Sequence, residues 1–138
     1  MNFFSKMIIA LFLLSIFPAG TVSAERNTLD IVTQVQITCR TEDAIISRQY
    51  MQPHKISAVL NYLRLLDCKG KADADPEQLI GDSFEIVLHD ASGQHSIYRQ
   101  RANRFFSKNS KPWMQVSPVQ ASRLYSLLQA MPSDAPVP

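Results

Sequence analysis

Two histidines and a glutamate are the residues of this chain whose types and spacing could bind a metal ion. Glu85, His89 and His95 lie in and beside a segment in which polar and apolar residues alternate, as in a half-buried strand. If residues 91–93 form a hairpin loop, His89 lies opposite His95 and Glu85 lies on the same face. Imidazole and carboxylate groups bind zinc and copper. These three residues are the candidate metal site, and an exposed histidine pair beside a turn is the alternative.

A second group of residues could bind a partner. Basic and aromatic side chains are interleaved between Tyr98 and Trp113. The candidate partner-binding residues are Arg99, Arg101, Arg104, Phe106 and Trp113. Arginine and aromatic side chains contribute much of the binding free energy in protein interfaces, and they also suit anionic polymers and membrane headgroups. The structural alternative is a hairpin with solvated charges and with aromatic rings in the core.

The sequence contains no motif that indicates catalysis or a cofactor. No Gly-x-Ser-x-Gly elbow occurs, and the residues after Asp73 and Asp75 lack the glycine and the closing glutamate of a calcium loop. We therefore expect a non-catalytic binding module that acts through contact with another protein, without a cofactor and without a specific nucleic acid. The alternatives are a small metal-dependent or hydrolytic protein that uses His89, His95 and Glu85, and a binder of anionic polymers or membrane surfaces.

The first 24 residues have the pattern of a secretory signal peptide. A short start with Lys6 precedes an apolar run over residues 7–17, and small residues lead to Ala24. The apolar run is about half of the roughly 20 residues that span a bilayer. We expect cleavage after Ala24 and a secreted or extracytoplasmic protein with no membrane span after cleavage. Its partner would then be another extracellular or envelope protein.

Charge is balanced in total after the leader but is uneven along the chain. Residues 25–92 carry 7 basic and 11 acidic side chains, a net charge of −4. Residues 93–138 carry 6 basic and 1 acidic side chains, a net charge of +5. This asymmetry favours one basic face on the folded chain and bears on its partners.

Cys39 and Cys68 are the only two cysteines of the chain. An even number of cysteines in an exported protein favours a disulfide, and no Cys-x-x-Cys pair or further ligand residue supports redox or metal chemistry. A bridge would close a loop of about 30 residues, which the chain-entropy argument values at about 3–4 kcal/mol. We therefore expect a structural disulfide between Cys39 and Cys68.

The elements that position these residues alternate between strands and helices. Period-two patterns predict strands over residues 30–40, 83–90, 94–98 and 113–116, and helical spacing predicts helices over residues 53–68 and 118–131. Residues 41–51 could extend the first strand after a bend. The order β-α-β-β-β-α predicts a two-layer α+β domain over residues 25–132, with an antiparallel sheet of about four strands packed on two helices. Residues 133–138 are predicted to be a flexible tail.

The hairpin between the two central strands has a definite predicted register. A three-residue loop pairs Ile86 with Tyr98 and Glu85 with Arg99. The second pair joins opposite charges, which favours this register over one shifted by a residue. We therefore expect Tyr98 to face the core.

Overall fold

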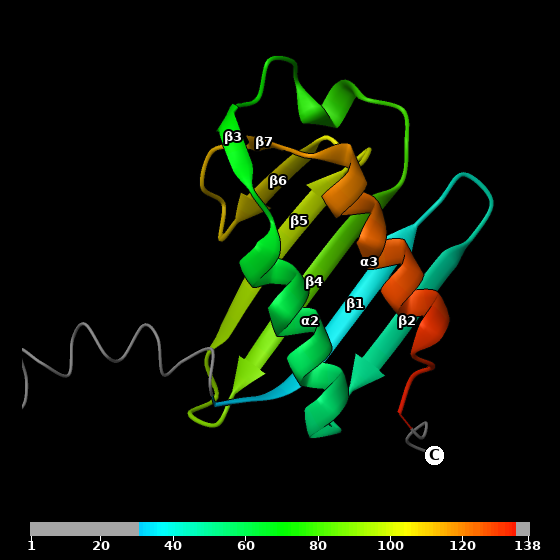
Figure 1. Ribbon diagram of the computed structural model, residues 1–138, viewed down its shortest axis with the longest axis vertical. Helices are drawn as coiled ribbons and strands as arrows, with labels where there is room; N and C mark the ends of the chain where they lie inside the picture. The colour runs from blue at the N-terminus through cyan, green and yellow to red at the C-terminus, as the bar shows by residue number, and fades with distance from the viewer. Residues whose placement is uncertain (1–30, 135–138) are drawn as a thin grey trace, which may run out of the picture. The chain divides into compact units, whose positions relative to one another are not determined.

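Seven antiparallel strands and two helices make up the fold of residues 31–134, which the computed structural model describes (Figure 1). The strands are β1 (Val32–Arg40), β2 (Ile45–Tyr50), β3 (Cys68–Lys71), β4 (Ser83–Asp90), β5 (His95–Arg101), β6 (Phe105–Lys108) and β7 (Met114–Val116). The helices are α2 (Pro53–Leu65) and α3 (Pro118–Ala130), with a short 3-10 helix, η1 (Pro76–Gln78). The leader predicted over residues 1–24 lies outside the described residues. None of the described helices has the length and apolar character needed to span a membrane.

The strands lie in the order β2-β1-β4-β5-β6-β7-β3. The hairpin of β1 and β2 forms one edge, and α2 then carries the chain across the sheet to β3 at the opposite edge (Figure 1). The chain returns through η1 to β4 beside β1, and β4 to β7 follow one another as neighbours. Both α-helices lie on the same face of the sheet (Figure 1), so neither covers the opposite face, which we call the uncovered face.

Alternation along the strands decides which residues form the core. In β1, Val35, Ile37 and Cys39 are fully buried, and they pair with the buried Leu88 and Ile86 of β4 and with Phe84. Successive residues of a strand point to opposite faces, so these side chains share the face that the helices cover. The apolar stripes of α2 and α3 complete this core with Val59, Leu60, Leu124 and Leu128. The N-terminus of α3 is capped, because the Ser117 side chain accepts the backbone N–H of Gln120.

The predicted register of the β4–β5 hairpin is confirmed. Ile86 pairs with Tyr98 and Glu85 pairs with Arg99, and Tyr98 is buried as expected. The Asp90 carboxylate organises the loop by accepting the hydroxyl and the backbone N–H of Ser92 and the backbone N–H of Gln94. These hydrogen bonds, led by the one from the Ser92 hydroxyl, lower the pKa of Asp90.

The prediction of a sheet of about four strands is wrong, because β2, β3 and β6 were not recognised as separate strands. The turn between β5 and β6 uses Ala102 and Asn103 at φ 53° and 51°. Glycine is the usual residue in such left-handed conformations, so the sequence, which has no glycine here, gives no sign of the turn. The four residues of β3 show no alternation, and they become a strand by pairing with the distant β7. The first helix therefore ends at Leu65, before the predicted limit.

The predicted disulfide between Cys39 and Cys68 is also wrong, since both cysteines are free. Cys39 is fully buried in β1, whereas Cys68 is exposed at the start of β3. Four strands, β4 to β7, lie between β1 and β3 in the sheet. A disulfide needs two Cα atoms within roughly 7 Å of each other, and this topology keeps them apart. Burial, assisted by the charge of Asp82, raises the pKa of the Cys39 thiol to about 11.

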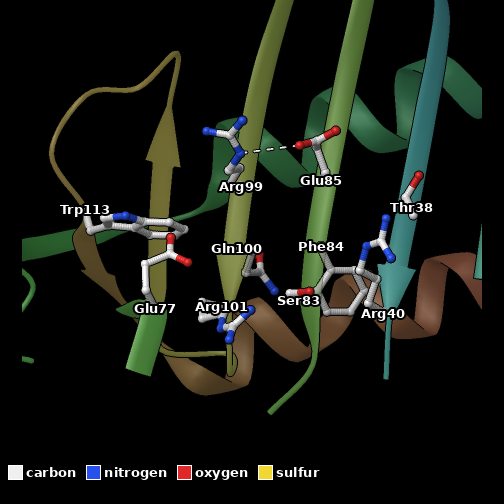
Figure 2. Close-up of a pocket in the computed structure, with 10 residues that line it drawn as sticks. All are labelled: Thr38, Arg40, Glu77, Ser83, Phe84, Glu85, Arg99, Gln100, Arg101 and Trp113. Atoms are coloured by element: carbon white, nitrogen blue, oxygen red, sulfur yellow. Dashed lines mark hydrogen bonds and ion pairs between the residues drawn. The ribbon is translucent and has the colours of Figure 1, made fainter. Parts of the chain in front are cut away.

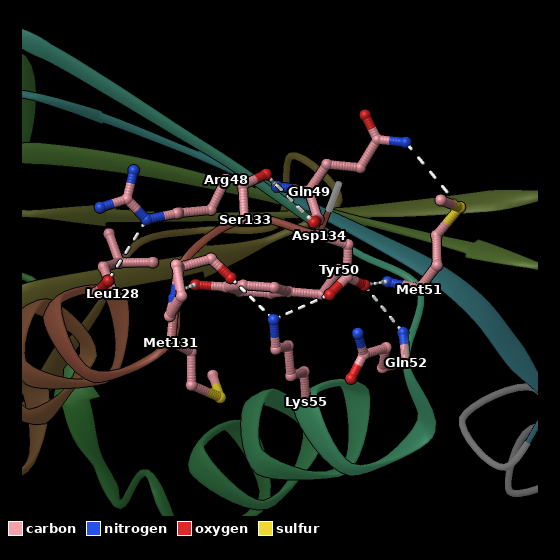
Figure 3. Close-up of polar contacts among 11 residues, drawn as sticks. Arg48, Gln49, Tyr50, Met51, Gln52, Lys55, Leu128, Met131, Ser133 and Asp134 are labelled. Atoms are coloured by element: carbon pink, nitrogen blue, oxygen red, sulfur yellow. Dashed lines mark hydrogen bonds and ion pairs between the residues drawn. The ribbon is translucent and has the colours of Figure 1, made fainter. Parts of the chain in front are cut away.

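Ser133 and Asp134, predicted to begin a flexible tail, are instead part of the fold (Figure 3). The buried Asp134 carboxylate accepts the backbone N–H groups of Met51 and Gln52 with one oxygen. Its other oxygen lies 2.8 Å from the Lys55 ammonium. Gln52 is the N-terminal cap residue of α2 and makes no side-chain cap hydrogen bond. Asp134 therefore fixes the entry into α2 from the far end of the chain, and its negative charge lies at the N-terminus of the helix.

The same segment covers part of the outer edge of β2. The Gln49 backbone N–H donates to the Ser133 hydroxyl at 2.9 Å, and the Asp134 N–H donates to the Gln49 carbonyl at 2.9 Å. The Tyr50 hydroxyl donates to the Met131 carbonyl at 2.6 Å. These contacts, which we call the C-terminal clasp (residues 131–134), satisfy backbone groups that an edge strand otherwise leaves open.

We predict that the native protein contains one reactive thiol and no disulfide. Exposed Cys68 should be modified by an alkylating reagent, and buried Cys39 should react only after denaturation, because burial both blocks access and keeps its thiol protonated. Mass spectrometry of alkylated native and denatured protein should show one and two added groups, respectively. A denatured, unreduced protein with no added group would contradict the free thiols.

We predict that Asp134→Asn lowers the free energy of unfolding at pH 7. The hydrogen bond from Lys55, followed by that from Met51, lowers the pKa of Asp134 to about 2, below the roughly 3.9 of an unfolded chain. The contribution of the carboxylate is therefore complete above about pH 4 and is lost as the pH falls toward 2. Thermal unfolding between pH 2 and 7 should show a weaker acid dependence in Asp134→Asn than in the wild type. The exposed Asp43→Asn is the control, and equal effects of the two substitutions would contradict the clasp.

Candidate functional site

A hollow of about 240 Å³ lies on the face of the sheet opposite the two α-helices (Figure 2). Strands β1, β4 and β5 supply most of its lining, and η1 and the segment before β7 supply the rest. Its charged lining residues are Arg40, Arg99, Arg101, Glu77 and Glu85, and its aromatic lining residues are Phe84 and Trp113. We call this region the arginine hollow.

The register of three strands assembles the arginine hollow in two rows. In one row Thr38 of β1 pairs with Glu85 of β4, which pairs with Arg99 of β5. In the next row Arg40 pairs with Ser83, which pairs with Arg101. Figure 2 shows Ser83 between the two arginines. Two strand spacings place the Cα atoms of these arginines about 10 Å apart, and the small serine leaves the space between them open.

Positive charge exceeds negative charge in the arginine hollow. Three arginines face two glutamates, and Glu85 already accepts a hydrogen bond from the Arg99 Nε at 3.3 Å. The Arg99 and Glu85 side chains are 45% and 48% exposed, so their ion pair is screened by water and is readily exchanged for another partner. The hollow is therefore suited to an anionic group.

Arg101 contributes a buried, unpaired donor to the arginine hollow. Its Nη2 donates to the Leu79 carbonyl at 3.2 Å, whereas its buried Nε has no hydrogen-bond partner among the described residues. A buried donor without an acceptor costs about 1–3 kcal/mol. A rotation of the guanidinium toward an anion in the hollow would give Nε an acceptor that the fold does not supply.

Trp113 borders the arginine hollow and is the only tryptophan of the chain. Its carbonyl accepts the backbone N–H of Ala72 at 3.0 Å, which ties the segment before β7 to the segment after β3. Its indole fluorescence can therefore report directly on what occupies the hollow.

The structure brings together three of the five predicted partner-binding residues. Arg99, Arg101 and Trp113 line the arginine hollow. Arg104 instead pairs with Asp73 at 3.2 Å and does not line the hollow. Phe106 is buried on the helix-covered face, where its ring lies 5.6 Å from that of Tyr98. Phe106 is therefore a core residue.

The three predicted metal ligands are not assembled into one site. The rings of His89 and His95 lie 5.9 Å apart, and His89 Nε2 lies 3.0 Å from the Gln36 side-chain oxygen. Glu85 pairs with Arg99. Within residues 31–134, no group of three or more histidine, cysteine, aspartate or glutamate side chains is placed to hold a metal ion.

Sequence reasoning missed Thr38, Arg40, Ser83 and Glu77 as members of the site. The alternation of the first strand places Thr38 and Arg40 on its polar face, which is a signal for exposure alone. Only the pairing of β1 with β4 brings Arg40 beside Ser83, and that register could not be derived from either strand by itself.

Buried polar contacts beneath the arginine hollow fix strand β5. Gln100 lies between Arg99 and Arg101 in sequence, and its side chain lies on the opposite face of the sheet, where it accepts a hydrogen bond from the Tyr62 hydroxyl of α2. The Gln100 amide donates to the Ala121 carbonyl of α3 at 3.0 Å. Burial raises the pKa of the Tyr62 hydroxyl, which therefore stays protonated and remains a donor. Both helices thus hold the strand that carries two arginines of the site.

Comparisons of the chain with protein families, with curated proteins and with solved structures find no match.

We predict that Tyr62→Phe destabilises the fold by about 1–3 kcal/mol, because the buried Gln100 oxygen loses its donor. Urea denaturation measures the change in the free energy of unfolding. Tyr125→Phe removes a hydroxyl from a tyrosine of α3 that is 39% exposed and is the matched control, with little expected effect. Equal stability of the two variants would show that the contact does not secure β5.

Proposed function

We propose that this protein is an exported, non-catalytic binding module that holds an acidic segment of a partner protein on the uncovered face of its sheet. The observation that carries the proposal is the gathering of Arg40, Arg99 and Arg101 around one hollow with Trp113 at its border. Guanidinium groups match carboxylates in geometry and in charge, and arginine and tryptophan are frequent anchors of protein interfaces. The site therefore has the composition of a protein contact.

The size of the arginine hollow supports a side chain of a partner as its occupant. Pockets that enclose small molecules measure roughly 300–1,000 Å³, and the hollow measures about 240 Å³. An aspartate or glutamate side chain fits such a volume while the rest of the partner lies across the sheet. Arg99 can exchange Glu85 for a carboxylate of the partner because both side chains of this ion pair are about half exposed.

The proposed location follows from the leader. Residues 1–24 have the charged start, the apolar run and the small residues of a cleavable signal peptide. The partner is accordingly another extracellular or envelope protein. An acidic segment of such a protein complements the excess of basic residues after residue 92.

We predict that Arg40→Gln combined with Arg99→Gln abolishes capture of the partner. The double variant removes two exposed cations of the hollow and leaves the buried core unchanged, so the melting temperature should stay close to that of the wild type. Surface and secreted proteins are passed over the immobilised protein at about 150 mM salt. The wild type should retain a discrete protein, and the double variant should retain at least tenfold less, which corresponds to about 1.4 kcal/mol.

Arg123→Gln is the matched control, because Arg123 is an exposed arginine of α3 on the other side of the sheet. Equal capture by all three proteins would contradict the proposal. Retention of polyanions alone, lost as salt rises, would instead favour the anionic-polymer alternative.

A further inference from the structure

Beside the arginine hollow, the loop between η1 and β4 exposes an aliphatic side chain almost completely. Ile80 is 98% exposed, the highest value among the large apolar residues that the structure describes as exposed. It lines a second hollow of about 460 Å³ together with Arg40, Ser83 and Arg101, which also line the arginine hollow. The two hollows therefore share a basic boundary, with Trp113 in one and Ile80 in the other.

The loop that presents Ile80 is held on both sides of this residue. Before it, the Leu79 carbonyl accepts Arg101 Nη2 at 3.2 Å. After it, the Asp82 carbonyl accepts the backbone N–H of Ala102 at 2.8 Å. Between them Gly81 has a φ of +148°, and a Cβ at this position would lie 2.9 Å from the Ala102 Cβ. Close packing that only glycine allows thus fixes the exposed position of Ile80 in the fold.

We infer that Ile80 is the apolar anchor of the partner interface, and that the partner segment carries an apolar residue next to its acidic residue. The carboxylate binds between Arg40 and Arg101, and the neighbouring apolar side chain packs on Ile80. This inference rests on the proposed function and deepens it by giving the chemistry of the bound segment. A pre-ordered anchor lowers the entropy cost of binding, which is the advantage of holding an exposed isoleucine in place.

The surroundings of Ile80 favour a protein partner over a membrane surface. Glu42, Asp82, Arg40 and Arg101 line the same hollow as Ile80, so charges of both signs surround it, whereas an anionic membrane surface is bound by clusters of basic residues. One isoleucine also buries little area in a bilayer. In a protein interface, by contrast, an apolar anchor is commonly surrounded by polar and charged side chains.

A displayed library of random 12-residue peptides, selected on the full chain, tests the inference without knowledge of the natural partner. Dissociation constants of the selected peptides are then measured by Trp113 fluorescence for the wild type, for Ile80→Ser and for the Arg40→Gln/Arg99→Gln variant. Val119→Ser is the matched control, because Val119 is 70% exposed on α3. Vesicles of phosphatidylglycerol and phosphatidylethanolamine are the membrane probe.

The inference expects selected peptides in which Asp or Glu adjoins an aliphatic or aromatic residue. Ile80→Ser should weaken their binding at least tenfold, and Val119→Ser should leave it unchanged. Peptides that lose binding in the arginine variant but bind Ile80→Ser like the wild type would overturn this inference and leave the proposed function standing. An empty selection, or binding unchanged in both variants, would overturn both. Vesicle binding that Ile80→Ser abolishes would overturn the protein anchor in favour of a membrane contact.

Discussion

The antiparallel pairing of β1 with β4 is the constraint on which both faces of the sheet depend. These strands are distant in the sequence, and their register sets Ile37 against Ile86 and Arg40 against Ser83. Since alternate residues point to opposite faces, the same register places the apolar pairs under the helices and the polar pairs on the other side. A slip of one residue would exchange the apolar and the polar pairs between the faces. Burial of the core and assembly of the arginine hollow therefore depend on the same register.

Two sets of contacts hold the helices against the sheet. Beneath the arginine hollow, Gln100 joins β5 to Tyr62 of α2 and to α3. At the start of α2, Asp134 accepts the backbone N–H groups of Met51 and Gln52 and pairs with Lys55 of the first turn, so the C-terminal clasp fixes the helix and the edge of β2 together. Helix termini leave backbone groups unsatisfied, and here residues from the end of the chain satisfy those that the local sequence does not. The arginine hollow can therefore remain polar and open while the helix-covered face holds most of the buried core.

Local patterns in the sequence were sufficient for part of this fold. The alternation of the first strand, the stripes of the two helices and the hairpin register that pairs Ile86 with Tyr98 are all present. The three missed strands form by pairing with partners that no local pattern predicts, or follow left-handed turns at residues such as Ala102, where glycine is usual. The prediction of a disulfide is wrong because the number of cysteines and the expected compartment carry no information on the position of β3 in the sheet.

The candidate site shows the same division. Arg99, Arg101 and Trp113 could be chosen from composition, whereas Arg40 joins them only through long-range pairing. Phe106 was misassigned because the turn before it reverses the chain and directs its ring into the core. The exposure of Ile80 could not be derived either, since it follows from the close contact of Gly81 with Ala102.

The central claim is that the arginine hollow is where the partner binds, and nitrogen-15 NMR of the side chains tests it most directly. The arginine Nε–H and tryptophan indole N–H groups give their own signals, which can be followed while a selected peptide is titrated into the labelled protein. The account predicts that the signals of Trp113, Arg40, Arg99 and Arg101 shift in saturable steps with one affinity, and that the signal of Arg123 does not. Shifts confined to Arg123 and to the backbone of α2 and α3 would place binding on the helical face and would contradict the account.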